Sequence, residues 1–159
     1  MLDELARLTG FNYSHTYNAN PITCATGMAV LDEYERLSLI DNAANTGRYL
    51  KNSILALAEE CEVIGDVRGR GLLLAIEMVA DKSSKQKIAA DFLPTEKIRI
   101  HGLRNGLIIY SRKTAGGKYG DWFLIAPPLT ISEVECDELI ARMRATLHDF
   151  STELSGRAT

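Results

Sequence analysis

The hydrophobic pattern changes its period near residue 63, and this change constrains the fold more than any other feature of the chain. Before it, apolar and small residues recur at steps of three and four, which predicts a helix with one apolar face; they are Ile40, Ala43, Gly47, Leu50, Ile54, Leu57 and Cys61. Residues 63–79 then contain a continuous apolar run bounded by glycines, as in a strand buried on both faces. The chain must therefore pack helices against a sheet.

Asn20 and Pro21 mark the start of an earlier helix. Asn can accept a hydrogen bond from a free first-turn N–H group, and proline at the first position loses no donor that the helix needs. We expect this helix to run to about Arg36. Its first turns are small residues and include Gly27, which predicts close packing of that face, either within this domain or at a seam with another domain or subunit.

Two capping patterns mark further helix starts. Ser38 with Asp41 is a capping-box variant, and Ser132 with Glu135 is a full S-x-x-E box. The remaining expected elements are a short helix from Pro94 to Asn105-Gly106, a strand over 107–112, the Gly-rich loop TAGGKYGD and a strand over 122–126. The resulting fold class is α+β, a mostly antiparallel sheet with helices on one face.

Composition excludes several classes of protein. The 159 residues suit one domain, and a net charge of −3 offers no basic excess for a phosphate backbone, so we expect no nucleic-acid partner. No apolar stretch is long enough to span a bilayer, and the start MLDELAR has acids where a signal peptide would carry bases. We therefore expect a cytoplasmic protein with no membrane partner.

Cysteine and histidine spacing gives no metal site. Three dispersed cysteines predict buried free thiols in a reducing compartment, and the three histidines lack HxxxH or HExxH spacing. The glycines around Arg70 precede a strand instead of a helix, so they do not form a dinucleotide fingerprint. The loop TAGGKYGD also lacks the ending of a P-loop, and no complete catalytic constellation is present.

The segment His15-Thr16-Tyr17 lies just before the Asn20 helix start. A hydroxyl and backbone N–H groups near a helix N-terminus can hold an anion, because first-turn N–H groups are free and the dipole is positive there. Hydroxyls at such positions also serve simply as caps or turn formers, so both interpretations stay open on this pattern alone.

Three sequence blocks, in order, closely resemble the C-terminal part of class III aminotransferases; they are HTYNANPITCATGMAVLDEYE (15–35), GDVRGRGLLLAIEMVADK (65–82) and GDWFLIAPPLTISEVECDELI (120–140). The family comprises pyridoxal 5'-phosphate (PLP) enzymes of fold type I, in the branch called omega-transaminases. The resemblance implies the small C-terminal domain over 21–154, a lead-in with the HTY turn over 1–20 and a frayed tail over 155–159. It also implies a homodimer or higher oligomer.

In this family the cofactor binds a lysine some tens of residues before the HTY block, in a large domain. Only fourteen residues precede His15 and none is lysine, so we expect no catalytic residue in this chain and a missing large domain as its partner. The resemblance assigns Thr16 to the cofactor phosphate of the neighbouring subunit. An imine of PLP at Lys51 or Lys113 would be adventitious, because no partner for the pyridine nitrogen is expected.

Substrate selection rests on an arginine in this family. The fixed arginine that some branches carry before the proline of the last strand is absent, since that segment reads Leu124-Ile125-Ala126-Pro127. The resemblance makes Arg112 the candidate for the mobile arginine that pairs with a substrate carboxylate; the alternative is an ordinary solvated strand-end arginine. Arg68 and Arg70 are expected to hold backbone or carboxylate contacts within the fold.

The resemblance implies transfer of an amino group from an amine or amino acid to a keto acid, by the complete enzyme and not by this chain alone. Two alternatives remain: a non-catalytic domain that only self-associates or binds a partner, and a two-chain enzyme completed by a separately encoded large domain. A missing domain should also leave apolar surface around Ile22, Met28 and the Pro127-Pro128 turn, which predicts association.

Overall fold

The helix predicted after Asn20 is α2 (Pro21–Arg36) in the computed structural model, which describes residues 4, 7–8, 10, 15–113, 117–118 and 120–157. The chain divides into two compact units, residues 1–38 and 39–159. Every residue of α2 is exposed, and a Cβ on Gly27 would meet no atom within 4 Å among the described residues. Both explanations of the small residues, close packing within this domain and a seam with another domain or subunit, stay predictions. Ile22 and Met28 are exposed, as expected.

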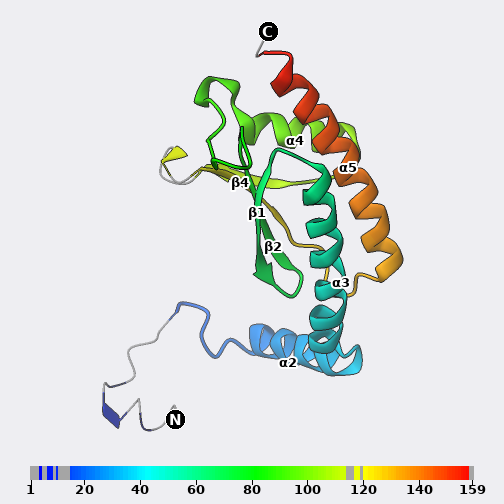
Figure 1. Cartoon of the computed structure of the whole chain (residues 1–159). Coiled ribbons are helices and arrows are strands. Elements are labelled where there is room, and N and C mark those ends of the chain that lie inside the picture. The colour runs from blue at the N-terminus through cyan, green and yellow to red at the C-terminus, as the bar shows by residue number, and fades with distance from the viewer. Residues whose placement is uncertain are drawn as a thin grey trace. The chain divides into compact units, whose positions relative to one another are not determined.

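The second unit contains three long helices; they are α3 (Leu39–Glu60), α4 (Pro94–Arg104) and α5 (Glu133–Ser155). In Figure 1, α3 and α5 run beside each other along one side of the sheet. The α5 capping box is confirmed: Ser132 Oγ accepts from the Glu135 N–H, and Glu135 accepts from the Ser132 N–H. At the start of α3 the predicted box does not form, because Ser38 has a left-handed φ of 49° instead of the extended backbone that a cap needs.

Residues 63–79 contain two strands, so the prediction of a single strand in this segment is wrong. β1 (Ile64–Arg70) and β2 (Leu73–Met78) pair antiparallel across a turn at Gly71, whose φ of 57° is left-handed. Burial on both faces is also wrong: Leu74, Ile76 and Met78 are buried, whereas Leu73 is 58% exposed. Gly71 is the turn residue, since glycine adopts a left-handed φ at little cost, whereas Gly65 and Gly69 lie within β1.

Two further strands complete a four-stranded antiparallel sheet of order β1-β2-β4-β3. β3 covers Tyr110–Lys113, so it begins three residues later than predicted, and β4 covers Asp121–Ile125. The short η1 helix (Ala90–Phe92) precedes α4. The helix and loop around it are as expected: α4 ends at Asn105-Gly106, and the segment DKSSKQK is a largely exposed loop.

The core lies between the three helices and one face of the sheet. Alternate residues of the inner strands β2 and β4 supply the sheet side of the core, and Phe123 of β4 is fully buried there. Met143 and Phe150 of α5 are fully buried on the helix side. Two predictions of burial are wrong. Ile40, expected on the apolar face of α3, is 73% exposed. Of the three cysteines, Cys136 is buried, Cys61 is half-buried and Cys24 is exposed. Because all three helices cover one face, the opposite face of the sheet stays open within the described residues of the second unit.

Candidate functional site

The segment before α2 is a hydrogen-bonded turn that carries Thr16. The Asn18 N–H donates to the His15 carbonyl oxygen at 2.9 Å, and the Asn20 N–H donates to the Tyr17 carbonyl oxygen at 3.2 Å. These bonds fix the backbone on both sides of Thr16, whose side chain is exposed. The turn therefore presents a hydroxyl donor on a defined piece of backbone, which suits a contact to a phosphate oxygen.

The Asn20 side chain accepts hydrogen bonds from N–H groups that the predicted anion site would have used. Its side-chain oxygen accepts from the N–H groups of Ile22 at 3.0 Å and Thr23 at 3.2 Å. Two of the first-turn donors of α2 are thus already satisfied. An anion at this turn would depend on Thr16 itself more than on the helix terminus.

Arg112 lies on β3, and its side chain belongs to the open face of the sheet. Its register partner is Trp122 on β4, and Tyr110 lies on the same face two residues before it. The guanidinium is exposed and forms no salt bridge with the described residues. The alternating register thus places Arg112 beside two aromatic residues. Sequence reasoning did not select Tyr110 and Trp122, although the spacing 110, 112 and 122, 124 on adjacent strands could have found them.

The other arginines of this face lie on β1. Arg68 pairs with Asp66 at 3.2 Å and with Glu77 at 3.1 Å, which confirms the expected carboxylate contacts. Arg70 is exposed at the end of the strand. A shallow depression of about 310 Å³ lies on this part of the face, lined by Arg68, Gly69, Arg70, Leu73, Ala75 and Leu124.

Two lysines of the second unit, Lys51 and Lys113, do not form a site for a PLP ring. Lys51 donates to the Gly69 carbonyl oxygen at 3.3 Å. Lys113 shares a depression of about 140 Å³ with Asp121 and Lys87, well below the roughly 300–1,000 Å³ typical of small-molecule sites. Burial raises the pKa of the Asp121 carboxyl, and the positive charges of Lys113 and Lys87 offset only part of this effect. Lys51 and Lys113 therefore do not fit the cofactor ring, and the phosphate contact expected at Thr16 stays a prediction.

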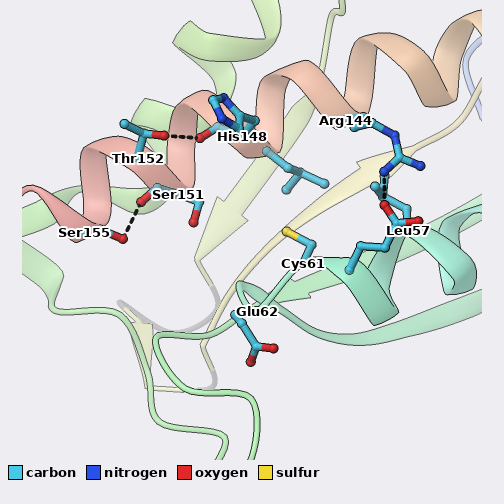
Figure 2. Close-up of a pocket in the computed structure, with 10 residues that line it drawn as sticks. Leu57, Cys61, Glu62, Arg144, His148, Ser151, Thr152 and Ser155 are labelled. Atoms are coloured by element: carbon cyan, nitrogen blue, oxygen red, sulfur yellow. Dashed lines mark hydrogen bonds and ion pairs between the residues drawn. The ribbon is translucent and has the colours of Figure 1, made fainter.

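A depression of about 610 Å³ lies between the end of α3 and α5 (Figure 2). Leu57 and Leu147 line its apolar part, and an ion pair between Arg144 and Glu60 joins the two helices. Burial raises the pKa of the Cys61 thiol in this depression, which favours the protonated, unreactive form. Neither Arg112 nor another β3 residue lines it, so it is separate from the candidate substrate residues.

Two absences concern only the described residues. Within them no helix has the length and apolar character to cross a membrane, and no group of three or more His, Cys, Asp or Glu side chains is arranged to hold a metal ion.

Comparison with known proteins identifies the family. The sequence profile of the family described as aminotransferase class III matches residues 3–147. A mitochondrial alanine–glyoxylate aminotransferase 2 homolog of Arabidopsis thaliana is 36% identical over 137 residues, which is 86% of this chain and 27% of that protein. The uncharacterized aminotransferase YodT of Bacillus subtilis is 37% identical, over 84% of this chain and 30% of that protein.

Solved structures give the same result. A thermostable (S)-enantioselective omega-transaminase from Thermomicrobium roseum superposes with a TM-score of 0.78 at 38% identity, over 94% of this chain and 32% of that one. The chain belongs to the class III aminotransferase family, and its α+β fold matches that of solved transaminases. It spans about a third or less of the length of the relatives it matches.

Proposed function

We propose that this chain forms the small domain, residues 21–154, of a PLP-dependent aminotransferase, with residues 1–20 as lead-in and 155–159 as tail. The complete enzyme would move an amino group from an amine or amino acid to a keto acid. The observation that carries the proposal is the family match over residues 3–147, combined with coverage of only 27–32% of the relatives. When bound, PLP supplies the electron sink for this chemistry.

Within that enzyme, the chain's own residues would bind and orient. The exposed Thr16 hydroxyl would donate to the cofactor phosphate across a dimer interface. The Arg112 guanidinium would pair with a substrate carboxylate, for which its planar fork of N–H donors is suited. The exposed apolar residues Ile22 and Met28 support association with a large domain or a second subunit.

A cytoplasmic location is part of this proposal. It is supported by the three dispersed cysteines, whose spacing suits free thiols in a reducing compartment. The Arabidopsis thaliana relative is named as mitochondrial, so this proposal places the chain in a different compartment from that relative.

The first test uses the chain alone. Purified chain with added PLP, alanine and glyoxylate should show no transamination, because the lysine that binds the cofactor is expected in the large domain. Transfer at an enzyme-like rate by the chain alone would overturn the proposal.

The second test completes the enzyme. In a chimera, residues 15–154 would replace the matching segment of the Thermomicrobium roseum transaminase. We expect transaminase activity, and Thr16→Val should weaken PLP binding roughly 10- to 100-fold, the effect of losing one charge-assisted hydrogen bond. Thr16→Ser should restore it, and Tyr17→Phe is the matched control. A folded, PLP-binding chimera that transfers no amino group would favour the non-catalytic alternative.

A further inference from the structure

Asp121 is a buried acid whose carboxyl has no partner among the described residues. It begins β4 on the face of the sheet that the helices cover, and the residue is only 7% exposed. No described residue donates a hydrogen bond to this carboxyl. Every side-chain oxygen of the described residues that is cut off from solvent does have a hydrogen-bond partner, so the Asp121 oxygens are not sealed in the core. They therefore reach the depression of about 140 Å³ that Asp121 lines.

A carboxyl in this position needs a hydrogen-bond donor. Burial of an unpaired carboxylate costs free energy, and burial accordingly raises the pKa of the Asp121 carboxyl. Buried polar groups in native proteins are almost always satisfied by protein, water or a ligand. The described residues supply no donor to Asp121, so its partner must be a molecule in the depression. The groups around the depression decide which kind of molecule fits.

The charges around Asp121 are mostly positive. Lys87 and Lys113 line the same depression, and no second acid lines it among the described residues. Lys113 is the register partner of Asp121, so the two side chains emerge on the same face of the sheet. The Lys87 ammonium donates to the carbonyl oxygens of Gly117, at 3.4 Å, and Lys118. Because an ammonium has three N–H donors, Lys87 is held in place with a donor left for a ligand.

The start of α4 adds to this positive potential. Pro94, the first residue of α4, lines the depression, and the preceding Leu93 provides no side-chain cap. A helix N-terminus carries a partial positive charge that favours an anion. The depression thus combines two ammonium groups and a positive helix end with a single carboxyl. This set of charges disfavours a metal cation and favours an anion.

One kind of anion suits the lysines and Asp121 together. At roughly 30 Å³ for each water-sized group, the depression has room for roughly five non-hydrogen atoms, the size of a phosphate or sulfate ion. Sulfate would satisfy the lysines, but at neutral pH it has no proton to donate to Asp121. Hydrogen phosphate offers both functions, because its charged oxygens accept from ammonium groups and its hydroxyl donates to a carboxylate.

We propose that Asp121, Lys87, Lys113 and the N-terminus of α4 form a binding site for a small oxyanion that carries a proton, with hydrogen phosphate as the best match. Asp121 would select the protonated ion, and the two lysines would neutralise its charge. The site is independent of the proposed function, since every group in it belongs to this chain.

Titration of the full chain followed by ¹H–¹⁵N NMR tests the site, because the backbone N–H groups of Asp121 and Lys113 report on it. Sodium phosphate, sodium sulfate and methyl phosphate are added at neutral pH and constant ionic strength. We expect saturable shifts with phosphate and a Kd of roughly 1 mM or lower. Sulfate should bind more weakly by roughly tenfold or more, because it leaves Asp121 without a donor. Methyl phosphate should also bind more weakly, because its extra group exceeds the available room, so this arm separates the free ion from a phosphate ester.

Variants then assign the roles. Asp121→Asn should bind sulfate more tightly than the parent does, because the amide can donate to a sulfate oxygen, and should lose the preference for phosphate. A purely structural role of Asp121 would not improve sulfate binding. Lys113→Met should weaken phosphate binding roughly tenfold or more. Lys118→Met is the matched control, because Lys118 is an exposed lysine of the same loop that does not line the depression, and it should bind phosphate as the parent does.

Four results would overturn the inference. They are no saturable shift with phosphate, equal affinity for phosphate and sulfate in the parent, tighter binding of methyl phosphate than of phosphate, or equal phosphate binding by the parent and Lys113→Met. The anion series uses the unmodified chain, so it decides even if a variant misfolds. No amino-group transfer is measured, so failure here would leave the proposed function standing, and an inactive chimera would leave this site standing.

Discussion

Replacing Gly47 with alanine tests how closely α3 packs on the turn between β1 and β2. A Cβ at Gly47 would lie 2.3 Å from the carbonyl carbon of Gly71, 2.5 Å from its oxygen and 2.7 Å from its Cα. Carbon atoms normally approach to about 3.5–4.0 Å, so the helix or the turn must move by roughly 1 Å. All three obstructing atoms are backbone, so no side-chain rotation can relieve the collision.

Two opposing effects set the size of the change. Overpacking a core typically costs about 1–3 kcal/mol, and a direct collision with backbone belongs near the upper end of that range. Alanine in place of glycine inside a helix contributes about 1 kcal/mol of stabilisation. The free energy of unfolding should therefore fall by about 2 kcal/mol, because the collision outweighs the gain in helix propensity.

Urea unfolding followed by Trp122 fluorescence measures this change. With a denaturant slope of roughly 2 kcal/mol/M, the midpoint of Gly47→Ala should drop by about 1 M. Gly27→Ala is the matched control: Gly27 also lies inside a helix, but a Cβ there meets no atom of the described residues within 4 Å. It should leave the Trp122 midpoint unchanged or slightly higher. A Gly47→Ala variant as stable as the parent would refute the packing argument.

Two further outcomes follow from local hydrogen bonds. Ser132→Ala should lower the free energy of unfolding by about 1 kcal/mol, since Glu135 then loses its capping partner, and Ser132→Asp should recover most of the loss in the same urea assay. Hydrogen bonds from the Ser84 and Ser83 side chains lower the pKa of the exposed Asp81 carboxyl to about 2. The stabilisation from these bonds is therefore complete above the ordinary pKa of an aspartate and disappears as the pH falls through about 2. A carboxyl ¹³C NMR titration should give that midpoint in the parent and a higher one in Ser84→Ala; an ordinary midpoint in the parent would contradict the geometry.

Reading the sequence was most successful at helix ends. The start at Asn20-Pro21, the capping box at Ser132 and the end at Asn105-Gly106 are all present in the structure. Each depends on bonds between residues two to five positions apart, so the sequence contains both partners. The failure at Ser38 is instructive, because the residue types of a capping box were present but the backbone adopted a left-handed φ.

The candidate site was predictable only in part. Thr16 and Arg112 came from resemblance to a family, and their roles stay predictions. Tyr110 and Trp122 were missed, because they become neighbours only when β3 and β4 pair in the observed register. Cross-strand register depends on the whole sheet, and a slip of one residue would turn Arg112 to the helix-covered face.

The sequence by itself determined the local elements and the α+β class, because periodicity and caps act within a few residues. Tertiary structure decided that residues 63–79 reverse at Gly71, because that turn is braced by α3 at Gly47. It also decided which sheet face is covered: three helices pack on the side of Phe123, and the arginine and aromatic residues are left on the other. Burial of a strand face depends on what packs against it, and that partner lies far away in the sequence.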